Sequence, residues 1–150
     1  MSLQKQVMDA MKSAMKEKRT NDLEALRAVK AAMLVAQTET GAKQELTEDE
    51  EIKLLQRLVK QRRDSAAIFN EQGRSDLAEP EVEQAAVIER FLPEQASEEE
   101  VAQVVDQVIS ETGASSMKDM GAVMGRTNQL LAGKADGKTI SAIVKQRLSS

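Results

Sequence analysis

The residues best placed for chemistry lie in the last third of the chain, in a segment from Met117 to Ala132 that Gly133 follows. Apolar residues recur there every three or four positions, which predicts a helix with one apolar stripe. Gly121 and Gly125 lie one turn apart and so share a strip of its surface. Each interior glycine costs about 0.5–1 kcal/mol relative to Ala, which indicates that something approaches the backbone closely. Close packing of a neighbouring helix is the commoner reason, and a phosphate group is the alternative.

Positive charge gathers around the glycine pair. Residues 112–150 carry six Lys or Arg against two Asp or Glu, whereas residues 39–111 have a net charge of −11 and residues 1–38 of +3. An acidic middle with basic ends gives a polarised surface if the ends converge, and ordinary solvated helix faces are the alternative. The residues expected to contact an anionic partner such as RNA are the two glycines, which permit close approach, and five cations: Lys118, Arg126, Lys134, Lys138 and Lys145.

The composition excludes several chemistries. The chain has no His, Cys, Trp or Tyr, so thiol or histidine metal sites and Ser-His-Asp or Cys-His nucleophilic machinery are excluded within it. We therefore predict no catalytic residues, no metal and no cofactor. With only Phe69 and Phe91 as aromatic residues, RNA would be recognised by phosphate and shape and not by base stacking.

Carboxylates are abundant enough for acid–base work, but capping explains the Glu-rich helix starts. An autonomous enzyme would reveal itself by releasing ammonia from glutamine. No segment reaches the apolar length that spans a bilayer, and the Lys-rich N-terminus lacks a signal-peptide core. We therefore expect a cytoplasmic protein without membrane contact.

Seven or so helical patterns, without alternating strands, predict an all-α protein. Thr47 and Ser97 each begin a capping box, and Gly41, Gly73 and Gly113 are placed to end helices. Residues 74–79 are predicted to form a connector, with Pro80 in the first turn of the next helix. The chain divides at about residue 95. Residues 1–95 are expected to form an antiparallel bundle of about four helices, and residues 96–150 a small three-helix domain.

Two charged residues fall inside apolar stripes. Arg62 lies in the stripe of the helix that Thr47 caps, and Glu89 in that of the following helix. An isolated buried charge is costly, so we predict that Arg62 pairs with an acid from residues 76–89, most simply Glu89. The pair is expected to fix helix register and not to take part in chemistry.

Seven stretches in order along the chain resemble the GatB/YqeY family, and specifically its stand-alone YqeY-like members. They are Leu23-Glu-Ala-Leu-Arg-Ala-Val-Lys30, Val59-Lys-Gln-Arg-Arg63, Phe69 with Arg74-Ser-Asp-Leu77, Phe91-Leu-Pro93, Met120-Gly-Ala-Val-Met-Gly125, Gly133-Lys-Ala-Asp136 and Ile143-Val-Lys145. The helix with two Met-Gly pairs, followed by Gly-Lys-Ala, is similar to the tail of the B subunit of the tRNA-dependent amidotransferase. Each motif is weak by itself, but together they span nearly the whole chain.

The resemblance implies kinship to carbon–nitrogen ligases that use glutamine as amido-N-donor, with a tail that contacts tRNA while other domains do the chemistry. This chain lacks the catalytic portion of the B subunit, so we expect a non-catalytic module. Its implied partners are tRNA, an amidotransferase or an aminoacyl-tRNA synthetase. The alternative is a protein-interaction or accessory module that does not bind RNA.

Overall fold

The computed structural model describes residues 2–39 and 45–149. By its internal contacts the chain forms two compact units, unit 1 (Met1–Leu92) and unit 2 (Pro93–Ser150). All regular secondary structure in the described residues is helical, which confirms the all-α prediction. None of the described helices is long and apolar enough to cross a membrane.

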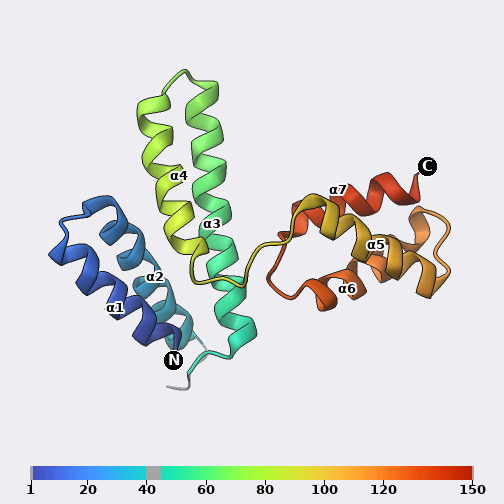
Figure 1. Ribbon diagram of the computed structural model, residues 1–150, viewed down its shortest axis with the longest axis horizontal. Helices are drawn as coiled ribbons and strands as arrows, with labels where there is room; N and C mark the ends of the chain where they lie inside the picture. The colour runs from blue at the N-terminus through green and yellow to red at the C-terminus, as the bar shows by residue number, and fades with distance from the viewer. Residues whose placement is uncertain (1, 40–44, 150) are drawn as a thin grey trace. The chain divides into compact units, whose positions relative to one another are not determined.

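Unit 1 is built from two helical hairpins (Figure 1). The first contains α1 (Leu3–Lys16) and α2 (Thr20–Glu39), and the second contains α3 (Glu48–Glu71) and α4 (Ser75–Glu89). α2 joins the hairpins, because it packs against α1 on one side and against α3 and α4 on the other. α1 thus has one extensive neighbour, where a closed four-helix bundle would give it two.

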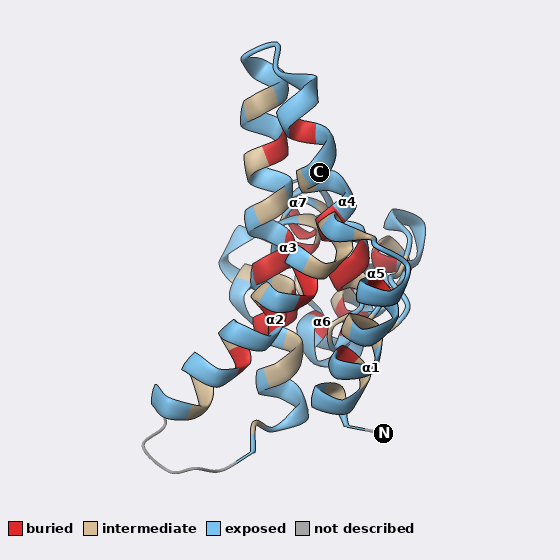
Figure 2. Cartoon of the chain, turned by 90° about the vertical axis from the view of Figure 1, so that its left-hand side faces the viewer, coloured by how far each residue is buried: buried red, intermediate tan, exposed pale blue. Residues whose placement is uncertain are grey.

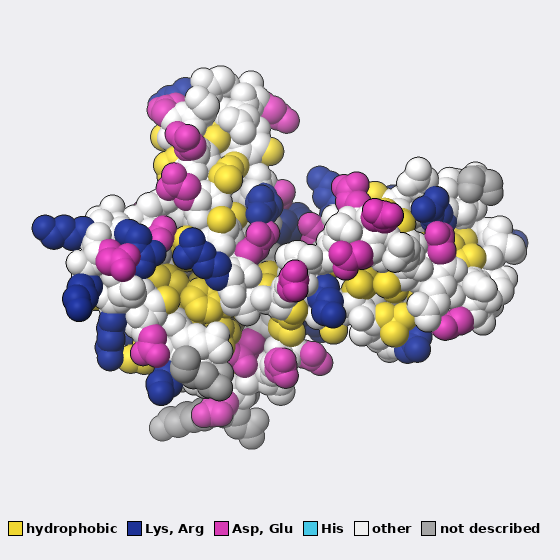
Figure 3. Space-filling view, in the orientation of Figure 1, with side chains coloured by type: hydrophobic (Ala, Val, Ile, Leu, Met, Phe, Trp, Pro, Cys, Tyr) yellow, Lys and Arg dark blue, Asp and Glu magenta, His cyan; other side chains and the backbone are white. Residues whose placement is uncertain are grey.

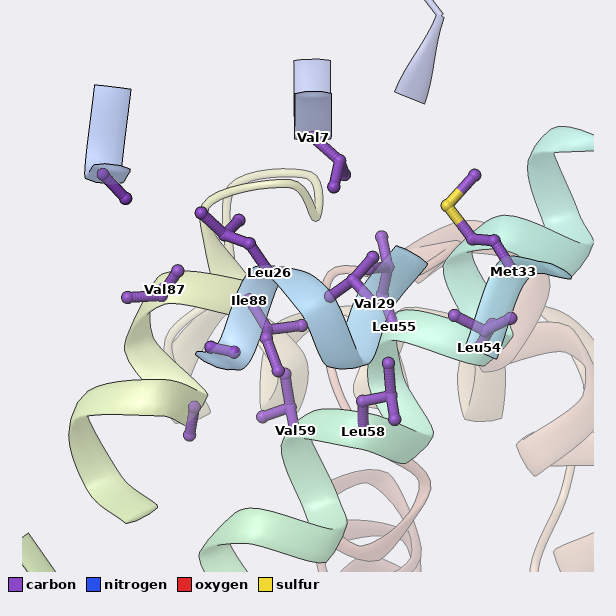
Figure 4. Packing of buried hydrophobic residues seen from close by; sticks show 13 residues of the cluster. Val7, Leu26, Val29, Met33, Leu54, Leu55, Leu58, Val59, Val87 and Ile88 are labelled. Atoms are coloured by element: carbon purple, nitrogen blue, oxygen red, sulfur yellow. The ribbon is translucent and has the colours of Figure 1, made fainter. Parts of the chain in front are cut away.

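The core of unit 1 lies where α2, α3 and α4 meet. Val29, Leu55 and Ile88, one from each helix, are at most 1% exposed and point toward one another (Figure 4). Burying a side chain of this size contributes about 1.5–3 kcal/mol. The turn of the α3–α4 hairpin projects beyond this core, and its end is mostly exposed (Figure 2).

Local signals set the ends of α3. The Thr47 side chain accepts from the backbone N–H of Glu50 at 3.2 Å, and the Thr47 backbone N–H donates to the Glu50 carboxylate at 3.3 Å. This confirms the predicted capping box. Gly73 follows the helix with a φ of +72°, a conformation that side chains disfavour. The predicted stop at Gly41 lies outside the described residues.

The start of α4 differs from the prediction. The helix begins at Ser75, so Pro80 lies inside it and residues 74–79 are not a connector. The backbone N–H groups of Leu77 and Ala78 both donate to the Arg74 carbonyl at 3.1 Å, which closes the first turn. Buried residues on both sides of Pro80, among them Ala78 and Ala85, pack α4 in place although the proline removes one hydrogen bond.

The predicted Arg62–Glu89 pair is also wrong, because the two residues have other partners. Arg62 donates from Nε to Oε1 of Gln84 at 3.1 Å and from Nη1 to the Leu58 carbonyl at 3.2 Å. Glu89 accepts instead from Nη2 of Arg63 at 2.8 Å. The side-chain partner of Arg62 is thus the neutral amide of the buried Gln84. A carboxylate in that place would also have to be removed from water, at a cost in free energy.

The Gln84 amide extends this contact into a chain of hydrogen bonds across three helices. Its Nε2 donates to Oδ1 of Asn21 at 2.8 Å, and Nδ2 of Asn21 donates to the Pro80 carbonyl and to Oε2 of Glu83, both at 3.1 Å. Side chains from α3, α4 and α2 are therefore connected through one buried amide.

Unit 2 contains α5 (Glu98–Thr112), the short 3-10 helix η1 (Met117–Asp119), α6 (Met120–Leu131) and α7 (Gly137–Leu148). Each of the three α-helices packs against the other two. Their shared core includes Val105, Val123 and Val144, all without exposed surface. The segment before α5 is fixed to the α6–α7 turn, because Ala96 donates its backbone N–H to the Lys134 carbonyl at 2.8 Å.

Candidate nucleic-acid interface

α6 carries the two glycines and owes its position to the residues opposite them. Val123, Thr127 and Leu131 recur every four residues, are at most 5% exposed and anchor the helix in the core of unit 2. Gly121 and Gly125 are exposed, and a Cβ built at either one meets no neighbouring atom within 4 Å. Close packing of a neighbouring helix therefore does not explain the pair. The strip of backbone that they expose is open.

The start of this segment is held by a cap at Ser116. Ser116 accepts from the backbone N–H of Lys118, and the Asp119 carboxylate accepts from the Ser116 N–H, a capping box around η1. At the other end, Asp136 accepts from the Thr139 N–H at 2.7 Å and caps α7. These caps fix the backbone on both sides of the glycine strip without using the predicted cations.

All five predicted cations are exposed. Lys118 lies in η1 at the start of α6, Arg126 lies on α6 beside Gly125, and Lys134 lies in the turn after α6. Within residues 2–39 and 45–149, none of the five forms an ion pair; Arg126 donates to the Gln129 amide oxygen at 3.4 Å. Their charges are thus directed to solvent, as an anion-binding surface requires.

Lys138 and Lys145 form a second group, on α7. They are seven residues apart, two helical turns, so they share one face of the helix. That face is opposite Ile140 and Val144, which are buried. Since α6 and α7 pack against each other, their outward faces point in different directions around the core of unit 2. The predicted residues therefore lie on the outward faces of two different helices, or in the short segments at the ends of α6.

The exposed side of α6 also includes Ala122 and Gln129, which are not among the predicted contact residues. Both lie opposite the buried stripe when each residue is advanced by about 100°. The helical period of the sequence could have added both residues to the predicted contact surface. Small or uncharged residues thus border the glycines on the helix itself, and a ligand could come close without meeting a carboxylate from α6.

The described residues contain no group of three or more acidic side chains that could hold a metal ion. Acidic residues with shifted pKa values lie in unit 1 and have local causes. The hydrogen bond from Arg74 lowers the pKa of Asp76 at the start of α4. Partial burial, with Glu48 and Glu45 nearby, raises the pKa of Glu51. Both pKa shifts therefore arise locally, from partial burial at Glu51 and from neighbours within six residues along the chain for both groups.

Thr127 provides a stability test of α6. Its side chain has no exposed surface, and among the described residues its Oγ1 has no hydrogen-bond partner. An unsatisfied buried hydroxyl is unfavourable, so Thr127→Val should raise the free energy of unfolding by about 1 kcal/mol. Thermal unfolding followed by circular dichroism measures this. Thr127→Ser, which keeps the hydroxyl and loses a methyl group, should destabilise; a Val variant that also destabilises would show that the hydroxyl is satisfied.

Comparison with known proteins supplies a family. A family model described as "Yqey-like protein" matches residues 4–148. A mitochondrial protein of Clavispora lusitaniae, altered inheritance of mitochondria protein 41, is 31% identical over 125 residues, which cover 81% of this chain and 72% of that protein.

A second relative is larger. The E subunit of the glutamyl-tRNA(Gln) amidotransferase of Thermococcus gammatolerans is 37% identical over 73 residues. These residues are 46% of this chain but only 12% of that protein, so most of it has no counterpart here. The resemblance drawn from the sequence motifs is confirmed by the match across nearly the full chain, and the protein belongs to the YqeY-like family.

Proposed function

We propose that the chain is a non-catalytic module that binds tRNA on the exposed surfaces of α6 and α7 and acts in association with an amidotransferase. One observation carries the proposal: the glycine strip of α6 is bare, open to solvent and flanked by exposed cations. A phosphate backbone can approach such a strip closely, because no Cβ holds it away. The relationship to a subunit of the glutamyl-tRNA(Gln) amidotransferase supports tRNA as the polyanion.

Recognition on this surface would depend on charge and shape. Unit 2 contains no aromatic residue, so bases have no ring to stack on. Cations that contact phosphates release counterions, which makes affinity fall steeply with salt. The proposal thus predicts binding of tRNA at low salt with weak discrimination among tRNA sequences.

Filling the glycine strip tests the proposal without damaging the fold. In a Gly121→Leu, Gly125→Leu variant the new Cβ atoms meet no neighbour within 4 Å, and replacing helical glycine should raise stability by about 0.5–1 kcal/mol per site. The new side chains should hold a phosphate away and weaken tRNA binding about tenfold or more. Filter binding at two salt concentrations, together with thermal unfolding, separates the two effects.

Ser110→Leu is the matched control for this experiment. Ser110 is exposed on α5, opposite the buried Val101 and Val105, and so lies in the same unit but off the glycine strip. Its replacement should leave tRNA binding unchanged. The proposal is contradicted if the wild-type protein binds no tRNA at low salt. It is also contradicted if Ser110→Leu weakens tRNA binding as much as the double glycine variant does.

A protein-interaction module without RNA binding is the second candidate. Met117 and Leu130 are 45% and 40% exposed, so unit 2 also offers apolar surface next to its cations. Methionine adapts well to protein contacts. Partners captured from cell extract that survive nuclease treatment, with no tRNA retained by the purified chain, would favour this function over the first.

A further inference from the structure

Unit 1 has a groove that the proposed function does not use. It runs between α1 and α2. Val7 and Met33 form its floor and are 1% and 6% exposed, whereas Met8 and Leu34 form its walls and are 42% and 52% exposed. Lys30 also lines it. An apolar floor between exposed apolar walls is the form of a binding groove for an apolar ridge.

Cations border both walls of the groove. On α1, Lys5 and Lys12 lie three residues before and four residues after Met8, so they flank it on the same face. On α2, Arg27 and Lys30 lie seven and four residues before Leu34, again on one face. All four are exposed, and none forms an ion pair within the described residues. Figure 3 shows one face of the molecule, on which apolar side chains reach the surface among basic and acidic ones.

We propose that this groove docks an amphipathic helix of a partner protein, with an apolar stripe bordered on both sides by Asp or Glu. A helix lays such a stripe into the channel between two antiparallel helices, using residues at i, i+4 and i+7. Lys5 to Lys12 spans seven residues, roughly 10 Å, which matches two turns of such a stripe. Acidic borders on the partner would face the cations on both walls, which favours this partner and disfavours a basic one.

Other occupants fit less well. A nucleic acid gains nothing from an apolar floor, because its outer surface is charged. A membrane meets a convex apolar face and not a channel between two helices. Within the described part of the chain, the acidic starts of α3 and α5 continue into stripes that their own units already bury, so these two helices of a second copy are not free to enter the groove. This surface shares no residue with the proposed tRNA surface, so either can fail alone.

The test uses the full chain and three synthetic peptides of about 18 residues, long enough to form helix when bound. The first has a Leu stripe bordered by Glu, the second has the same stripe bordered by Lys, and the third has the composition of the first in scrambled order. Isotope-labelled methionine methyl groups report binding by NMR. Met8 and Met33 lie in the groove, and Met117, Met120 and Met124 in unit 2 serve as internal controls.

We expect the Glu-bordered peptide to shift the Met8 and Met33 signals and to leave the unit 2 signals in place. A Lys12→Glu, Lys30→Glu variant should bind that peptide about tenfold or more weakly. Lys53→Glu, an exposed change on α3 away from the groove, should bind it normally. The proposal is overturned if no peptide shifts Met8 and Met33, if all three shift them equally, or if phosphatidylserine vesicles or tRNA shift them and the Glu-bordered peptide does not.

Discussion

Replacing four exposed cations of unit 2 by glutamine should abolish tRNA binding at physiological salt and weaken it about 100-fold or more at low salt. The variant carries Lys118→Gln, Arg126→Gln, Lys138→Gln and Lys145→Gln. Each cation that contacts a phosphate contributes about 0.7–0.9 to the slope of log affinity against log salt, so losing four contacts should lower that slope by roughly three. The fold should be unaffected, because all four side chains are exposed and none forms an ion pair within the described residues.

Net charge has to be separated from position in this experiment. The chain has a net charge of −4, and the fourfold variant makes it more negative. A matched variant that replaces four exposed cations of unit 1 by Gln changes the net charge equally: Lys16, Lys18, Lys53 and Arg57. It should keep most of the affinity. Equal losses in the two variants would mean that only overall charge matters, and an unchanged salt slope in the first would remove the proposed surface.

The second large effect concerns the buried amide of unit 1. Gln84→Ala should lower the free energy of unfolding of this unit by about 2–3 kcal/mol. It removes the acceptor of the Arg62 Nε–H and the donor to Asn21 at once, and it leaves a space where a buried side chain stood. Arg62 and Asn21 are partly exposed, so water can satisfy part of what they lose, which keeps the cost below that of a fully buried charge.

Urea denaturation measures this cost through the helical circular-dichroism signal, since the chain has no Trp or Tyr to report by fluorescence. Glu83→Ala is the control, because exposed Glu83 only accepts from Asn21 at the end of the same chain of hydrogen bonds. It should cost less than about 0.5 kcal/mol. A Gln84 variant as stable as the Glu83 variant would show that the amide does not hold the three helices together.

A double-mutant cycle refines the second prediction. Gln84→Ala and Asn21→Ala remove two ends of one 2.8 Å hydrogen bond. Their effects should not add: the double variant should be more stable than the sum of the single costs implies, by about 0.5–1.5 kcal/mol. Strict additivity would indicate that the bond contributes nothing beyond the packing of each side chain.

The sequence by itself determined the features that depend on neighbours along the chain. The capping box at Thr47 occurs where its residues predict it, and at Ser97 the side chain accepts from the Glu100 N–H, because a cap joins groups only two or three residues apart. An apolar stripe on α6 was predicted for the same reason, but only the structure centres it on Val123, Thr127 and Leu131 and leaves Met117 45% exposed. Membership of the family also followed from the order of short motifs.

Only the tertiary structure decided which faces meet and at what height along the helices. Helical period placed Arg62 and Glu89 on inward faces, but it says nothing of axial register, and Gln84 lies five residues, roughly 7.5 Å, from Glu89 along α4. Pro80 falls inside α4, where buried residues on both sides of it pack the helix in place. By sequence the glycine pair favoured a packed helix over an open strip, and the structure shows the open strip. Its exposure was decided by how α5 and α7 cover the opposite side of α6, and that depends on contacts between residues far apart in the chain.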